Sequence, residues 1–202
     1  MQRYEFFLIF VPYYQRNMEQ NVIQKNMWNT AGKAGLLLGA VPVAYLLITQ
    51  WMTMAEIPAF LQTIISMALW IIKFGGCIWF MIFFMKQFLS ENPEADRNSV
   101  FKTGMAMAFL SALVYAAFTF ANLAFLYPDY FAGQMETMMQ QFAPLLDSNT
   151  TASMEKTMQN LPQITFFSNL IYCFIYGTAL SSIISRYLTR LNPFNGYKSE
   201  DK

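Results

Sequence analysis

The chain contains no histidine among its 202 residues. It therefore lacks the commonest general base, the commonest metal ligand and the side chain that titrates near physiological pH. Its two cysteines, Cys77 and Cys173, stand far apart in apolar segments, which excludes a CxxC motif and a zinc-ligand spacing. We also find no nucleophile–base pair and no phosphate-binding loop. The sequence predicts a protein that is not an enzyme and needs no metal or other cofactor.

Charge is also scarce, because only 12% of the residues are charged while 55% are apolar. Average soluble domains carry about 25% charged residues. A chain of this composition is typical of a membrane protein, so we expect the lipid bilayer to be its main contact. The net charge of +1 gives no strong field for nucleic acid, and no nucleic-acid partner is expected.

What the chain does have is long apolar stretches. A helix needs about 20 residues to cross a bilayer, and backbone polar groups in lipid must be satisfied within their own segment. We predict an all-α fold, a four-helix transmembrane bundle, with its spans at 34–54, 60–85, 103–127 and 164–188.

The distribution of lysine and arginine predicts the orientation of these spans. Eleven of the thirteen basic residues lie in three segments: before the first span, between the second and third spans, and near or after the end of the fourth. These three segments are on the same side of the membrane. The opposite side has only Lys156. By the positive-inside rule, we expect a cytoplasmic arm at 1–33, one membrane domain at 34–190, a cytoplasmic tail at 191–202 and an outer, periplasmic loop at 128–163.

The first 17 residues have an apolar run too short for a signal peptide. The favoured interpretation is a mis-assigned start or a loose arm, since termini are usually poorly ordered unless they are tied down. The alternative is an aromatic segment that lies on the inner leaflet.

The outer loop at 128–163 is too long for a plain connection. Helical spacing of its methionines and other apolar residues predicts an amphipathic helical hairpin between the third and fourth spans. Methionine thioethers also suit Cu(I), but no histidine or cysteine assists them here, so we favour apolar packing.

Small residues predict which helix faces pack together, because they let helices approach closely in lipid. We assign this packing role to three stripes: Gly35 and Gly39; Gly104, Ala108, Ala112 and Ala116; and Gly177, Ser181 and Ser185. Asn122 and Asn169 each lie five residues inside the outer end of their spans, so we expect their amides to hydrogen-bond across the interface between spans three and four.

Lys73 lies in the middle of the second span, and no span contains a carboxylate. Depth counted from the outer ends places Lys73, Tyr115 and Tyr176 in one layer, which is a candidate intramembrane polar site. In one interpretation Lys73 binds tyrosine hydroxyls, ring faces or free carbonyls. In the other it lines a wet cavity or pairs with an anion, a lipid headgroup or an acid on another protein.

Several segments together resemble a known family. They are a basic loop, KQFLSENPEADRNSVFK, the small-residue span TGMAMAFLSALVYAAF, the sequence LYPDYF, a Met/Gln/Glu-rich outer helix and a last span that ends in SIISR. The chain is similar to the bacterial membrane family called domain of unknown function 4199, and the likeness covers about residues 30–190. The resemblance implies a four-span inner-membrane protein of Gram-negative bacteria with no assigned activity.

Two functions remain open at this point. The first is a non-enzymatic scaffold, accessory or regulatory subunit in the inner membrane, which would form a homo-oligomer or bind another membrane protein through its small-residue faces. The second is an oligomeric transporter or channel component in which Lys73 lines a polar pathway. The absence of an inverted repeat weakens the second hypothesis, and an enzyme acting on lipids ranks last.

Overall fold

The protein is described by a computed structural model for residues 2–55, 57–142, 157 and 160–190. Four long helices are present in this part: α1 (Gln2–Met54), α2 (Ala59–Glu91), α3 (Arg97–Ala121) and α6 (Leu161–Arg190). A short π-helical turn, η1 (Asn122–Leu126), extends α3, and α4 (Pro128–Phe142) follows it. Each long helix is apolar enough to cross a membrane. The all-α fold with four spans is therefore confirmed.

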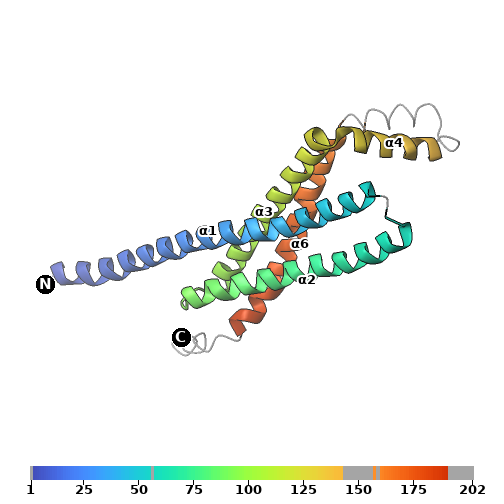
Figure 1. Ribbon diagram of the computed structural model, residues 1–202. Helices are drawn as coiled ribbons and strands as arrows, with labels where there is room; N and C mark the ends of the chain where they lie inside the picture. Colours follow the sequence, from blue (N-terminus) through green and yellow to red (C-terminus); the bar gives the residue numbers. More distant parts are fainter. Residues whose placement is uncertain (1, 56, 143–156, 158–159, 191–202) are drawn as a thin grey trace.

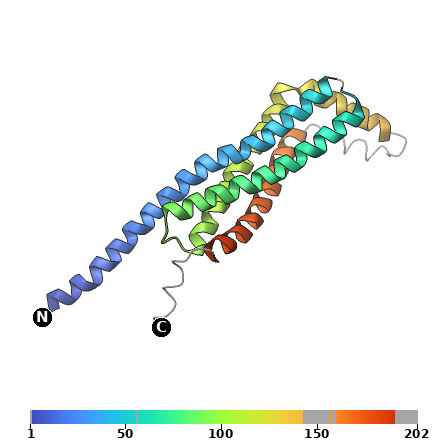
Figure 2. The ribbon, with the colours of Figure 1, turned by 60° about the horizontal axis from the view of Figure 1, so that its bottom comes forward.

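The N-terminal segment differs from the favoured expectation. Helix α1 begins at Gln2 and continues without a break into the first span, so residues 2–17 are not a loose arm. In Figure 2 this part of α1 runs on along the helix axis past the other helices, rather than turning aside. The run from 13 to 31 contains no proline or glycine. Nothing in it stops the helix that the apolar span nucleates.

In Figure 1, α3 and α6 lie side by side and cross α1 and α2, so the four long helices form a curved row whose two ends, α2 and α6, also meet. Helix α3 packs against α1 on one side and against α6 on the other, whereas α2 packs mainly on α1. The order across the row is therefore α2, α1, α3, α6. The two edge helices, α2 and α6, make little contact with each other.

Small residues hold α3 and α6 together, as the sequence predicted. A Cβ atom added at Gly177 would meet the Cβ of Ala108, and one added at Gly104 would meet the Ser181 side chain. The Ser181 hydroxyl donates to the Phe101 carbonyl at 2.9 Å. These contacts fix the antiparallel register, in which residues 104 and 108 oppose residues 181 and 177.

Glycine also brings α1 close to α3. A Cβ added at Gly35 would lie 2.6 Å from the Cβ of Leu110, and one added at Gly39 would lie 2.8 Å from the Cβ of Val114. Both distances are shorter than real carbon–carbon contacts. Both of the predicted glycine positions in the first span are therefore where the backbone of α1 approaches its neighbour.

The turn between α2 and α3 is held by polar side chains. The Asp96 carboxylate accepts a hydrogen bond from the Ser99 N–H at 2.8 Å and caps the N-terminus of α3. Partial burial raises the pKa of Asp96, but the Ser99 hydrogen bonds and the charge of Lys102 outweigh it and leave the pKa below its usual value. Asn26 of α1 donates to the Asn92 side chain at 3.0 Å, which ties this turn to α1.

Helix α4 matches the first half of the predicted outer hairpin. It begins at Pro128, where the missing N–H costs nothing because the first turn of a helix has no partner for it. Most of the second half of that hairpin, 143–156 and 158–159, lies outside the described residues, so the hairpin itself stays a prediction.

The close approach at Gly177 gives the first testable prediction. We expect Gly177→Ala to lower the free energy of unfolding by roughly 1–3 kcal/mol, because the new methyl group would overpack against Ala108. Gly75→Ala in α2 is the matched control, since its Cβ would meet nothing within 4 Å. Unfolding in mixed micelles, followed by circular dichroism, measures both variants. Equal stability of the two would show that α3 and α6 are not in close contact at Gly177.

Candidate functional site: a cavity around Lys73

Lys73 projects from the middle of α2 and is half-buried. Its ammonium nitrogen lies 4.4 Å from the ring centroid of Tyr45 and 5.0 Å from that of Phe74. Both distances are within the range of a cation–π interaction, which contributes about 0.5–2 kcal/mol. These contacts are of the kind named in the first interpretation of Lys73, in which it binds ring faces. Within the described chain no hydrogen bond joins it to Tyr115 or Tyr176.

The sequence did not identify Tyr45 as a partner, because counting from the ends of the spans compares Cα depths. Tyr45 lies nine residues before the end of α1, whereas Lys73 lies fourteen residues after the start of α2. A helical side chain tilts toward the N-terminus of its helix, and a lysine reaches roughly 6 Å, which is the rise of four residues. The ammonium group therefore lies at the level of Tyr45 although its Cα does not.

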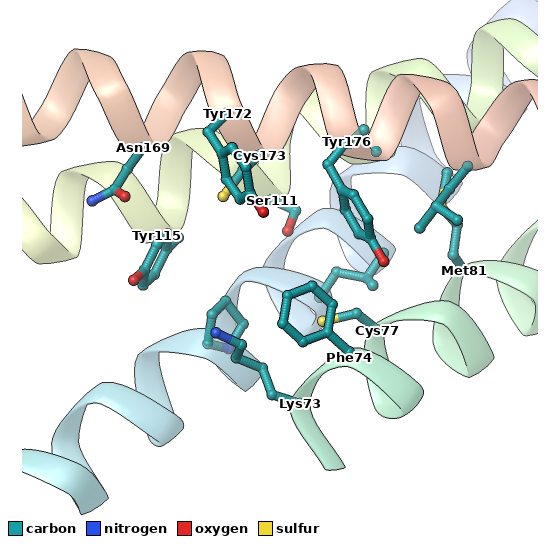
Figure 3. A pocket seen from close by; sticks show the side chains of 15 residues that line it. Lys73, Phe74, Cys77, Met81, Ser111, Tyr115, Asn169, Tyr172, Cys173 and Tyr176 are labelled. Carbon is teal, nitrogen blue, oxygen red and sulfur yellow. The ribbon is translucent and has the colours of Figure 1, made fainter. Parts of the chain in front are cut away.

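The Lys73 side chain lines a cavity of about 170 Å³, called here the Lys73 cavity (Figure 3). All four long helices contribute to its wall, although α2 and α6 contribute most. Phe74 of α2 meets Tyr176 of α6 edge to face, with ring centroids 5.7 Å apart. Polar groups on the wall besides Lys73 come from Ser111, Tyr115, Asn169, Tyr172, Tyr176 and the free thiols of Cys77 and Cys173.

The candidate residues Lys73, Tyr115 and Tyr176 all line this cavity, but they do not share one depth. The register set by Gly104 and Gly177 places Tyr176 opposite residue 109, six residues from Tyr115. At 1.5 Å per residue, the two tyrosines are separated by roughly 9 Å along the bundle. In Figure 3, Tyr115 lies near Asn169, whereas Tyr176 lies farther along the cavity, beside Phe74.

The same register explains why the predicted bond between Asn122 and Asn169 is wrong. Asn122 is fully buried and donates from Nδ2 to the Gln50 Oε1 atom of α1 at 3.1 Å. Asn169 instead falls opposite Ala116 and lines the Lys73 cavity. The two spans do not end at matching residues, so equal distances from their predicted ends did not mean equal depth.

A second cavity, called here the polar cavity, lies next to the Asn122–Gln50 pair toward α4. Its wall carries uncharged polar side chains: Thr49, Gln50, Thr53, Gln62, Thr119, Asn122 and Thr165. The Gln50 Nε2 and Asn122 Oδ1 atoms are buried and have no hydrogen-bond partner. The sequence signal for this site was the polar residue Gln50, which interrupts the apolar run of the first span.

The Lys73 cavity and the polar cavity lie one helical turn apart. On each of three helices a residue of one cavity is four positions from a residue of the other: Pro42 and Leu46, Tyr115 and Thr119, Asn169 and Thr165. Polar groups therefore extend along the inside of the helix row from the α4 end to Lys73.

The buried amide pair gives a second prediction. Gln50→Leu leaves the Asn122 amide without its acceptor, so we expect a loss of about 1–3 kcal/mol in the free energy of unfolding. Asn122→Leu should cost a similar amount, and the double variant should cost less than the sum of the two. Gln62→Leu is the control, because its bond to Thr53 is exposed. A double-mutant cycle in micelles that gives strict additivity would contradict the pairing.

Comparison with known proteins adds one finding. A sequence model of the family described as Protein of unknown function (DUF4199) matches residues 33–189, which include every residue of both cavities. No curated protein and no solved structure matches the chain.

Proposed function

The chain belongs to the DUF4199 family, and from this premise we propose that it is a non-enzymatic scaffold, accessory or regulatory subunit of an assembly in the bacterial inner membrane. In this proposal both termini are cytoplasmic and the loop at 128–163 is periplasmic. The positive-inside distribution of eleven basic residues against one supports that orientation.

One observation carries the proposal: the two ends of the helix row, α2 and α6, meet only loosely. Helix α2 packs mainly on α1 and makes little contact with α6. The Lys73 cavity lies between these edge helices, and Tyr172 on its wall is 63% exposed. A cavity that opens sideways between two edge helices suits a further transmembrane helix, which would pack across its mouth, against α2 and α6, by close van der Waals contact.

The exposed face of α2 adds to this argument. It carries several large apolar side chains, among them Trp70, Ile72 and Trp79. Lipid covers such a face as well as protein does, so the face alone does not require a partner. Next to the open cavity, however, it provides a continuous surface on which a partner helix would lie.

Photocrosslinking in native membranes tests the subunit role. We expect a benzoyl-phenylalanine in place of Tyr172 to crosslink to a defined integral membrane protein, because this position lies at the mouth of the cavity. The matched control is the same residue in place of Tyr187, which is 64% exposed on the same helix but is not part of the cavity wall. Crosslinks from position 172 to lipid alone would contradict the subunit role.

A second candidate function has one observation in its favour. The Lys73 cavity and the polar cavity lie one turn apart, which is the arrangement expected for part of a pathway in an oligomeric transporter or channel. A lysine in such a pathway would favour anions. Four spans are few for a pore, so this function would require several copies.

Anion flux tests this second function. If Lys73 lines a pathway, proteoliposomes with the wild-type chain should release chloride faster than empty vesicles, and Lys73→Met should remove most of that difference. Lys86→Met is the control, because Lys86 is exposed near the end of α2. Equal chloride release by the wild type and Lys73→Met would exclude a role for Lys73 in anion permeation.

A further inference from the structure

We propose that the Lys73 cavity receives a carboxylate side chain, Asp or Glu, from a transmembrane helix of a different protein. This inference rests on the proposed subunit function and names the kind of partner. In the docked state the partner carboxylate pairs with the Lys73 ammonium, while the partner backbone lies outside the cavity along α2 and α6.

The charge of Lys73 points to an anionic occupant. Lys73 has ring faces as its neighbours, Tyr45 and Phe74, and it makes no ion pair in the described part of the chain. Ionisable groups within a membrane are costly and normally pair with one another or face a polar cavity. The cavity wall holds a cation and no acid, so an anionic group is the occupant that complements it.

A second copy of this chain cannot be the source of that anion. Within the four spans of this chain, Glu91 at the very end of α2 is the one acidic residue. It lies eighteen residues from Lys73, or roughly 27 Å along the helix. A second copy therefore brings no carboxylate to the depth of Lys73, and the partner is a different chain.

The depth of Lys73 in the membrane favours a transmembrane helix over a phospholipid headgroup as the source of the anion. Lys73 lies fourteen residues, or roughly 21 Å, from the start of α2 at Ala59. The headgroups of phospholipids lie outside a hydrocarbon core about 30 Å thick, so their phosphates stay near the helix ends. A transmembrane helix satisfies its own backbone and can present a carboxylate at any depth.

The size of the cavity and the polar groups on its wall suit a single carboxylate side chain. The cavity of about 170 Å³ is close to the volume, about 150 Å³, that admits one benzene molecule in a protein interior. It therefore accepts one side chain and not a whole helix. Ser111, Asn169 and Tyr176 line it at different depths and form no hydrogen bond within the described chain, so the one nearest the docked carboxylate can donate to its second oxygen.

A defined probe tests the choice of partner. The full chain, with benzoyl-phenylalanine in place of Tyr172, is reconstituted with a leucine-rich transmembrane peptide that carries one central Glu, or with the same peptide carrying Gln. We expect the Glu peptide to crosslink about tenfold more than the Gln peptide. Lys73→Met should abolish this preference, whereas Lys86→Met should leave it unchanged.

A charge-reversal variant controls for misfolding, because a protein that fails to fold would not gain a new preference. In Lys73→Glu, the preference should switch to a peptide with a central Lys. Equal crosslinking of the Glu and Gln peptides to the wild type overturns the proposal. A spin-labelled fatty acid that binds in a Lys73-dependent way, while the Glu peptide shows no preference, also overturns it and assigns the cavity to a lipid carboxylate.

Crosslinking from position 172 in native membranes tests this inference separately from the subunit role. If the partner captured from position 172 has an acidic residue in the crosslinked span and is lost in Lys73→Met, both proposals stand. If the same partner is captured equally by Lys73→Met, the subunit role stands and the carboxylate proposal fails. If position 172 captures no protein, the subunit role itself fails.

Discussion

The close approach of α3 and α6 at Gly104 and Gly177 is the constraint on which the rest of the arrangement depends. A methyl group at either position would collide with the facing helix, so the two backbones have a single register. That register carries Asn169 and Tyr176 to the cavity wall and keeps Asn169 away from Asn122. The absence of side chains at these two glycines therefore determines which polar groups of α3 and α6 lie close to each other.

The same close packing explains why α2 remains at the edge. Helices α1, α3 and α6 have small residues on the faces where they meet, whereas the part of α2 near the cavity presents Lys73, Phe74 and Met81. Large side chains hold helices apart, and the space that remains becomes the cavity. The lysine is stabilised there by ring faces, which offer less to an ammonium group than a carboxylate does. Among the described residues, no carboxylate lies on the cavity wall to pair with Lys73.

Much of the fold was predictable, and the reasons are local. Hydropathy placed the four spans, since burial in lipid depends on each segment by itself. Glycine and alanine spacing identified the faces of α1, α3 and α6 that pack. The site was predictable only in part: Lys73, Tyr115 and Tyr176 do line one cavity, yet Tyr45 and Gln50 were missed as partners. Their contacts depend on side-chain reach and on register between helices, which a count along one helix does not contain.

The sequence by itself determined an all-α membrane protein, its four spans and a lysine in one of them without a nearby acid. The tertiary structure decided the order of the helices in the row, the two ends that meet only loosely and the partner of each buried polar group. The free energy of transferring a helix into lipid is a sum of contributions from its own residues, so it can be calculated along the sequence. Register and order depend on which surfaces fit across helices, so they exist only once the helices have packed.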